Sequence, residues 1–194
     1  IMAVIAPTVE YYRLVDDGTG AGTYKFDTGA PATLLDFGTI DAGTNTYEAT
    51  QANITNKLKS CQVYAIFNSK GASADASDMQ NTTLSVVSNE AGHEGNKVDT
   101  VYEKSWINVL MNNESFGSDA VALGNVTGSE VTKVLTAIGE DSSTNPGLIK
   151  GTRNDGTLAN ATHNYVICKL WANLEPNAAA GPHKFRLRTT YSYT

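Results

Sequence analysis

The chain has 194 residues, of which 41% are hydrophobic and 18% are charged, and these values allow one sizeable core rather than two. The net charge of -6 and the scattered basic residues argue against nucleic-acid binding, which requires clustered lysine and arginine. We also expect no membrane span, because no window approaches the run of about 20 apolar residues that a membrane-spanning helix needs.

Strand candidates follow one another through the first part of the chain. The segment AVIAPTVEYYRLV is the first, with a plausible hairpin turn at Asp17 and Gly18. LLDFGTIDAGTNT is predicted to be a short strand that runs into a turn, and TTLSVVS and VYEKSWINVLMN are further strand candidates. In NKLKSCQVYAIFN, a period of two places four residues on one face: Cys61, Val63, Ala65 and Phe67.

One stretch departs from this β pattern. In GSEVTKVLTAIGE, apolar residues occupy positions i, i+3, i+4 and i+7, which is the spacing of one helix face. Ser129 is a suitable N-cap and Gly139 a suitable stop. The sequence therefore predicts one short helix near 129–139, with this apolar face: Val131, Val134, Leu135 and Ile138.

The clearest alternation lies at the C-terminus. HKFRLRTTYSYT alternates apolar and polar residues to its end, and NYVICKLWANLEP alternates in the same way before a turn at Gly181 and Pro182. The earlier segment places Val166, Cys168, Leu170 and Ala172 on one face and Tyr165, Ile167, Lys169 and Trp171 on the other. These two strands are predicted to form a terminal hairpin. About eight short strands favour an all-β fold, an Ig-like or Greek-key β-sandwich with the one helix.

Residues that usually carry catalysis form no known pattern. There is no HExxH, GxSxG or phosphate-binding glycine motif, so we expect no enzyme, no catalytic residue, no metal site and no cofactor. Calcium binding by loop carboxylates such as Asp16 and Asp17 is a less favoured alternative to solvated charge. Tyr165 and Trp171 offer a sugar-stacking platform, although packing beneath a neighbouring sheet is favoured.

Two features suit a secreted protein. Cys61 and Cys168 allow a single pairing, and their long separation excludes a CxxC site, so we predict a disulfide between them, with two buried thiols as the alternative. The chain also carries five Asn-X-Ser/Thr sequons, against about three expected by chance. The candidate glycosylation sites are Asn53, Asn81, Asn113, Asn125 and Asn160.

The last strand and the turn before it resemble the C-terminal strand of chaperone–usher pilins. The resemblance consists of an AGP turn, a glycine fourteenth from the end, apolar–polar alternation and a penultimate tyrosine. The residues that carry it are Gly181, Phe185, Leu187, Tyr191 and Tyr193. A stretch of about thirty residues that includes KLWANLEPNAAAGPHKFRLRTTYSY is also similar to the closing hairpin of other secreted β-sandwich filament subunits in bacteria and archaea.

This resemblance implies assembly by donor-strand exchange, in which the N-terminal strand of one subunit fills a groove beside the last strand of its neighbour. Residues 1–15 would be the extension, and residues 16–194 a single β-sandwich domain. The candidate donor places these apolar residues on one face: Ile1, Ala3, Ile5, Val9 and Tyr11. The alternative is an ordinary first strand that folds into its own sandwich.

The sequence thus favours an extracellular structural subunit that forms a pilus-like homopolymer on the cell surface. A carbohydrate-binding or adhesive module, with cell-surface glycans as partners, is one alternative. A viral capsid or tail β-sandwich protein is another. Self-association, solvent-exposed glycan recognition and shell formation are separable by electron microscopy and by retention on polysaccharide.

Overall fold

The computed structural model describes residues 4–20, 22–42, 50–55, 60–152, 156–158 and 163–194. These residues form strands and two short helices, and the long alternating segments of the sequence account for most of the strands. In chain order the elements are β1 (Val9–Asp16), β2 (Tyr24–Phe26), α1 (Gln51–Thr55), β3 (Cys61–Asn68), β4 (Gln80–Ser88), α2 (Thr100–Glu103), β5 (Ile107–Met111), β6 (Val121–Leu123), β7 (Lys133–Val134), β8 (Tyr165–Ala172) and β9 (Phe185–Ser192).

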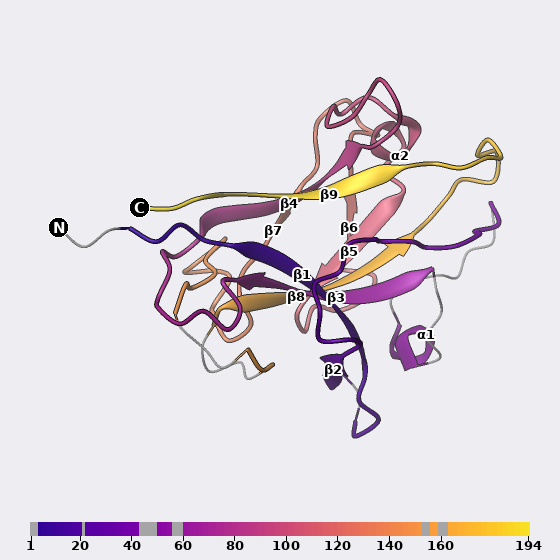
Figure 1. The fold of residues 1–194 in the computed structure, drawn as a ribbon. Helices are drawn as coiled ribbons and strands as arrows, with labels where there is room; N and C mark the ends of the chain where they lie inside the picture. Colours follow the sequence, from indigo (N-terminus) through magenta and orange to yellow (C-terminus); the bar gives the residue numbers. More distant parts are fainter. Residues whose placement is uncertain (1–3, 21, 43–49, 56–59, 153–155, 159–162) are drawn as a thin grey trace.

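The strands form two antiparallel sheets, so the predicted all-β sandwich is confirmed at this level (Figure 1). The larger sheet has six strands in the order β2-β1-β3-β8-β5-β6, and the smaller has three in the order β7-β4-β9. β1 and β2 form a hairpin across the predicted turn at Asp17 and Gly18, with the Asp17 amide donating to the Thr23 carbonyl at 3.2 Å.

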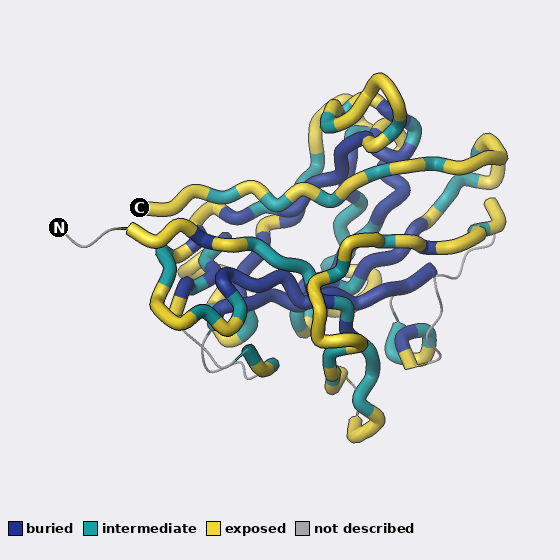
Figure 2. Tube along the Cα trace, viewed as in Figure 1, coloured by how far each residue is buried: buried dark blue, intermediate teal, exposed yellow. Residues whose placement is uncertain are grey.

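Apolar side chains cover both faces of the larger sheet, and its central strands β3 and β8 are buried along almost their whole length (Figure 2). The main core lies between the two sheets, where Ile66 of β3 and Leu170 of β8 meet Leu84 and Val86 of β4. A second cluster lies on the outer face of the larger sheet, beneath Ile54 of α1 and the side chains of β2. The predicted faces of β3 and β8 are therefore correct, and β8 is a central strand that is buried on both sides.

The predicted terminal hairpin is wrong. β8 pairs with β3 and β5 in the larger sheet, whereas β9 pairs with β4 in the smaller sheet. The segment 173–184 therefore crosses from one sheet to the other. The two strands differ in how many of their faces are apolar. β8 is apolar on both faces, so it lies in the centre of a sheet that is covered on both sides, whereas β9 carries exposed Arg186 and Arg188 on one face.

The predicted helix near 129–139 is also wrong. Val131 pairs with Gly124 through two main-chain hydrogen bonds of 2.7 and 3.2 Å, and β7 pairs with β4. Lys133 is buried, and its ammonium donates to Glu114 Oε1 at 2.6 Å. Val134 is 44% exposed, whereas the predicted helix would have buried Val134 and exposed Lys133. Neighbouring segments supply the hydrogen-bond partners that this extended main chain needs, and its β-branched residues favour an extended conformation. The helices are α1 and α2 instead, and Asp99 caps α2.

The segment predicted as a short strand at 34–42 has no strand partner, although Phe37 within it is buried. It runs as an irregular chain along the side of the sandwich, where it borders the groove described below. The turn that was expected at Gly43 lies outside the described residues.

The predicted disulfide is not formed, and both cysteines are buried free thiols. They lie on adjacent strands, but Cys168 is the register partner of Tyr64, three residues from Cys61. Side chains alternate between the faces of a strand, so this odd offset points the two sulfurs to opposite faces of the sheet. Cys61 belongs to the outer cluster and Cys168 to the core between the sheets. Burial raises the pKa of each thiol to about 12.

Candidate functional site: the open edge of β9

β9 is an edge strand with one unpaired side. β4 pairs with it over most of its length, and no strand among the described residues pairs with its other side. Its residues alternate between half-buried and exposed along all eight positions. The predicted acceptor residues Phe185, Leu187 and Tyr191 face the core, whereas Gly181 and Tyr193 lie outside the strand and are exposed.

The main-chain groups on this open side can be identified from the neighbouring hydrogen bonds. The Leu135 amide donates to the Thr82 carbonyl, so Thr82 faces the β7 side of β4 and Thr83 faces β9. Thr83 is the register partner of Thr190, and the Asn89 amide donates to the Lys184 carbonyl, so even-numbered residues of β9 bond to β4. The odd-numbered residues therefore direct their amides and carbonyls to the open side: Phe185, Leu187, Thr189 and Tyr191.

No hydrogen bond between two main-chain groups joins that open side to any other described residue, and the Thr189 main chain meets the Tyr11 hydroxyl there. An exposed row of alternating donors and acceptors is a template for another strand. Eight residues is long for an edge that natural proteins usually shorten, cover or charge. Among these residues, only Arg186 and Arg188 bring charge to the strand.

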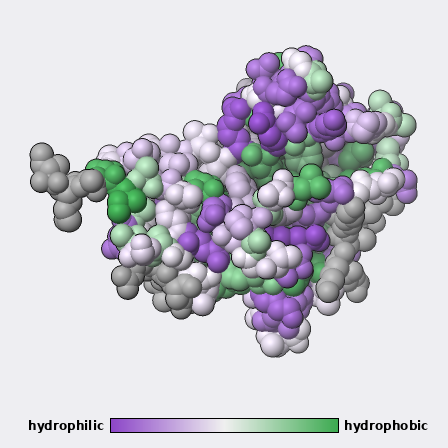
Figure 3. Space-filling model, in the orientation of Figure 1, coloured by the Kyte–Doolittle hydropathy of each residue, from purple (hydrophilic) through white to green (hydrophobic). Residues whose placement is uncertain are grey.

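An apolar groove lies between this open side and the segment 32–42. It consists of a cavity of about 280 Å³ beside Tyr11 and Leu187 and a cavity of about 700 Å³ beside Trp106 and Pro182. The two cavities share Leu35 and Phe185 in their walls, so they form one continuous depression. Hydrophobic surface is visible on this face beside β9 (Figure 3). We call this depression the β9 groove.

Aromatic side chains connect the two sheets along the β9 groove. The Tyr11 hydroxyl lies 2.5 Å from the Thr189 hydroxyl, and burial raises the pKa of the Tyr11 phenol to about 12. The rings of Phe37 and Phe185 stack with centroids 5.9 Å apart. At the wide end, the His183 and Trp106 rings lie nearly perpendicular with centroids 4.9 Å apart, and the Trp106 indole N–H donates to Glu175. These contacts hold the walls of the groove in place.

Only part of the predicted donor segment lies outside the sheets. Val9 and Tyr11 lie in β1, where they pair with β3 of the same chain, so the predicted boundary after residue 15 lies inside a strand. Ile5 precedes β1 and is 48% exposed, beside Val4 at 62%. Ile1 and Ala3 lie outside the described residues. The described end of the N-terminal segment lies next to the C-terminus (Figure 1).

The groups considered for other chemistry are engaged in local structure. Tyr165 and Trp171 are 2% and 3% exposed, so neither offers a surface for sugar stacking. Asp16 accepts hydrogen bonds from Gln51 and Thr55, and Asp17 accepts from Thr19 and Thr23. No group of three or more histidine, cysteine or acidic side chains with metal-binding geometry occurs in the described part of the chain.

Sequence reasoning missed the groove wall formed by residues 32–42. The signal was present in the apolar run of LLDFG, which was assigned to a strand because strands and buried loops share such runs. The position of β9 at an edge was also missed, because the predicted hairpin gave it a partner on that side.

No helix in the described ranges has the length and apolar character needed to cross a membrane. Comparisons of this chain with models of protein families, with curated proteins and with solved structures find no match.

Proposed function

We propose that this protein is a structural subunit of an extracellular, pilus-like filament, and that the β9 groove accepts the N-terminal strand of a neighbouring copy. The observation that carries the proposal is the open side of β9, where four residues direct main-chain groups that no described strand pairs with, beside an apolar groove. The resemblance of the C-terminal strand to those of secreted filament subunits points the same way.

The dimensions of the donor and the acceptor agree. Residues 1–8 precede β1, and an extended segment of this length spans about 26 Å, as does an eight-residue β9. Insertion of the whole segment would require release of the bonds that the Ser77 amide donates to the Ile5 carbonyl and the Ser69 amide to the Thr8 carbonyl. Ile1, Ala3 and Ile5 have the same parity, so one face of an inserted strand would carry all three into the groove. Main-chain hydrogen bonds would supply affinity, and the pockets would select the side chains. Val9 and Tyr11 stay in the sheet of their own subunit.

The positions of the chain ends favour a head-to-tail filament. The N-terminal segment leaves the sandwich beside the end of β9, whereas the wide part of the groove lies where β9 begins, near Gly181 and Phe185. A donor strand antiparallel to β9 would place its residue 1 near the end of β9 and its residue 8 near the start. The subunit that supplies the donor would therefore lie beyond the wide end of the groove. Such contacts join unlike surfaces and form an open helical array.

We also propose that the two sheets have a Greek-key topology. Successive strands change sheet five times, between β3 and β4, β4 and β5, β6 and β7, β7 and β8, and β8 and β9. These crossings are typical of Greek-key sandwiches, which are frequent in extracellular proteins.

Deletion of residues 1–8 tests the proposal. The full chain is expected to sediment as filaments visible by negative-stain microscopy, and the deletion variant is expected to remain monomeric with an unchanged far-UV spectrum. A synthetic peptide of residues 1–8 should then bind the truncated monomer. Filaments formed by the deletion variant, or a full chain that stays monomeric at high concentration, would refute the donor mechanism. Closed shells would favour the capsid alternative, and retention of a monomer on polysaccharide the adhesive one.

A further inference from the structure

We infer that Asn113 is an N-glycosylation site and that its glycan lies beyond the end of β5, away from the β9 groove. The inference rests on the extracellular location in the proposed function, since the modification occurs during export. It does not depend on filament formation. The sequon is Asn113-Glu114-Ser115, in the loop that follows β5.

The other sequons in the described residues are poor acceptors. Glycosylated asparagines generally lie in surface loops, but Asn53 lies in α1 and Asn81 in β4. The Asn81 amide also donates to the Ser192 hydroxyl of β9 at 3.1 Å. The side-chain oxygen of Asn125 is buried without a hydrogen-bond partner. Asn160 lies outside the described residues.

Asn113 is exposed in a turn whose other residues are fixed. The preceding Asn112 donates to the Thr136 carbonyl at 2.8 Å and accepts from the Ile167 amide at 3.0 Å. The following Glu114 accepts from the Met111 amide at 2.7 Å and pairs with Lys133. The Asn113 side chain itself makes no hydrogen bond to the described residues, so its carboxamide is held outward and available.

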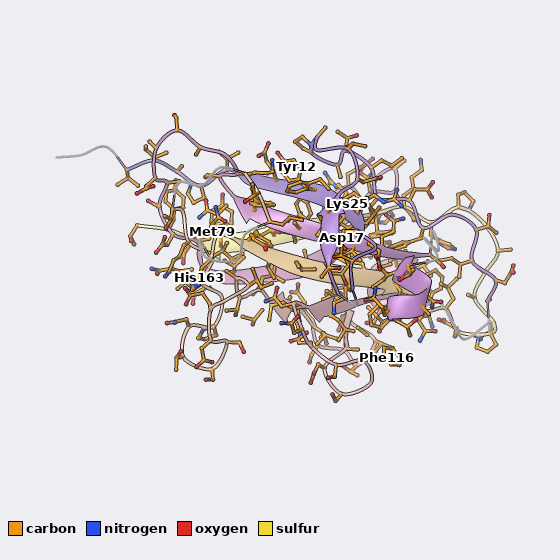
Figure 4. The ribbon with its side chains drawn as sticks, turned by 90° about the horizontal axis from the view of Figure 1, so that it is seen from below. Tyr12, Asp17, Lys25, Met79, Phe116 and His163 are labelled. Atoms are coloured by element: carbon orange, nitrogen blue, oxygen red, sulfur yellow. The ribbon has the colours of Figure 1, made fainter. Side chains whose placement is uncertain are left out.

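An exposed aromatic ring lies beside this turn. Phe116 is 49% exposed, and its ring centroid is 5.9 Å from that of Trp171. It projects from the loop region beyond the sheets (Figure 4). One face of this ring is exposed to solvent, and the apolar C–H face of the first sugar attached to Asn113 can pack against it. The glycan would thereby shield a hydrophobic side chain that water now contacts.

The position of Asn113 is compatible with the β9 groove. β5 lies toward the β6 edge of the larger sheet, and the Glu114–Lys133 pair connects its loop to β7 of the smaller sheet. The narrow part of the β9 groove lies where Tyr11 of β1 meets Thr189 of β9, and its wide part borders Ile107 at the start of β5, whereas Asn113 follows the end of β5. A glycan on Asn113 would leave the groove open, whereas one on Asn81 would lie beside the end of β9.

The chemistry requires a lipid-linked oligosaccharide, activated as a phosphate or diphosphate ester, and a membrane-bound transferase. Asn113 Nδ2 attacks the anomeric carbon, a C–N bond forms and the anomeric C–O bond breaks. The bonding electron pair leaves with the lipid phosphate, and the Nδ2 proton passes to a base of the transferase. No oxidant or reductant is needed.

Secretion of the full chain from cells that perform N-glycosylation tests the inference, with glycopeptide mass spectrometry as the readout. The Asn113 peptide should carry hexose or hexosamine mass, and one glycan mass should disappear in both Asn113→Gln and Ser115→Ala. Ser115→Thr keeps the sequon and should keep the glycan. Asn81→Gln should leave the intact mass otherwise unchanged.

An unmodified Asn113 peptide in the folded, secreted protein would overturn the inference, as would glycans on Asn53, Asn81 or Asn125 in place of Asn113. The result is separable from the filament proposal. Filaments built from unmodified subunits would contradict only the glycan, and a glycosylated chain that never polymerises would contradict only the filament.

Discussion

Proline substitutions at Thr189 and Thr190 distinguish the two sides of β9. Both residues lie in the same strand, but the Thr190 amide faces β4 and the Thr189 amide faces the open side. Proline lacks the amide hydrogen, and it is tolerated in edge strands where that hydrogen would face outward. Thr189→Pro should therefore impair assembly, and Thr190→Pro should impair folding.

The expected size of the effect follows from the hydrogen bonds involved. Loss of one main-chain bond costs about 0.5–1.5 kcal/mol, and a carbonyl of the incoming strand left without a partner costs about 1–3 kcal/mol. A combined loss of about 2 kcal/mol in Thr189→Pro would raise the critical concentration for assembly about thirtyfold. In Thr190→Pro a similar loss would lower the free energy of unfolding, because the bond to Thr83 belongs to the fold.

Pelleting over a concentration series gives the critical concentration, and urea unfolding gives the stability. Thr189→Val is the matched control, since it removes the hydroxyl near Tyr11 but keeps the main-chain amide. Assembly of Thr189→Pro at the wild-type critical concentration would refute the reasoning. A larger assembly defect in Thr190→Pro, at equal stability, would show that the open side has been assigned to the wrong residues.

Three further outcomes are expected. Ile5→Asp should raise the critical concentration by tenfold or more, because a carboxylate replaces an apolar donor side chain. Val126→Asp, at a more exposed site away from the groove, should not, and equal effects of the two variants would point to general charge repulsion. Cys61 and Cys168 should resist alkylation in the native protein and both react in denaturant without reductant, and a mass lower by two hydrogens would contradict the free thiols. The thiol pKa values rise from 9.0 to about 12 on folding, so the folded state retains protons that the unfolded state releases. Stability should therefore be full below pH 9 and fall as the pH rises toward 12, and a thermal midpoint that stays constant over this range would contradict the burial of these groups.

The local pattern of the sequence was sufficient to find the principal strands. The alternation over 165–172 and 185–192 predicted β8 and β9, and it also assigned the faces of β3 and β8 correctly. The pairing of these strands depends on contacts far apart in the chain. A turn at Gly181 suits a hairpin as well as a crossing between sheets, and only the doubly apolar character of β8 indicates its central place.

The helix error has a similar origin. The apolar spacing near 129–139 fits a helix face, but Val131 and Val134 are β-branched, and the buried Lys133 pairs with the half-buried carboxylate of Glu114. Pairing with β4 and Gly124 outweighs the weak local preference. The candidate site was only partly predictable for the same reason. Three of the five predicted acceptor residues lie in β9, but the opposite wall of the groove comes from an irregular segment without periodicity.

The direction of β1 would decide how the proposed filament carries tension. A pull on the N-terminal segment enters β1 at Val9 and acts along its axis, while its hydrogen bonds to β3 run across that axis from Val9 to Leu14. Such a load strains these bonds together, in shear, rather than opening them one at a time. β3 in turn is braced along its other side by β8. The same pairing that fixes the first strand in its sheet would thus make each subunit resist stretching more strongly than peeling.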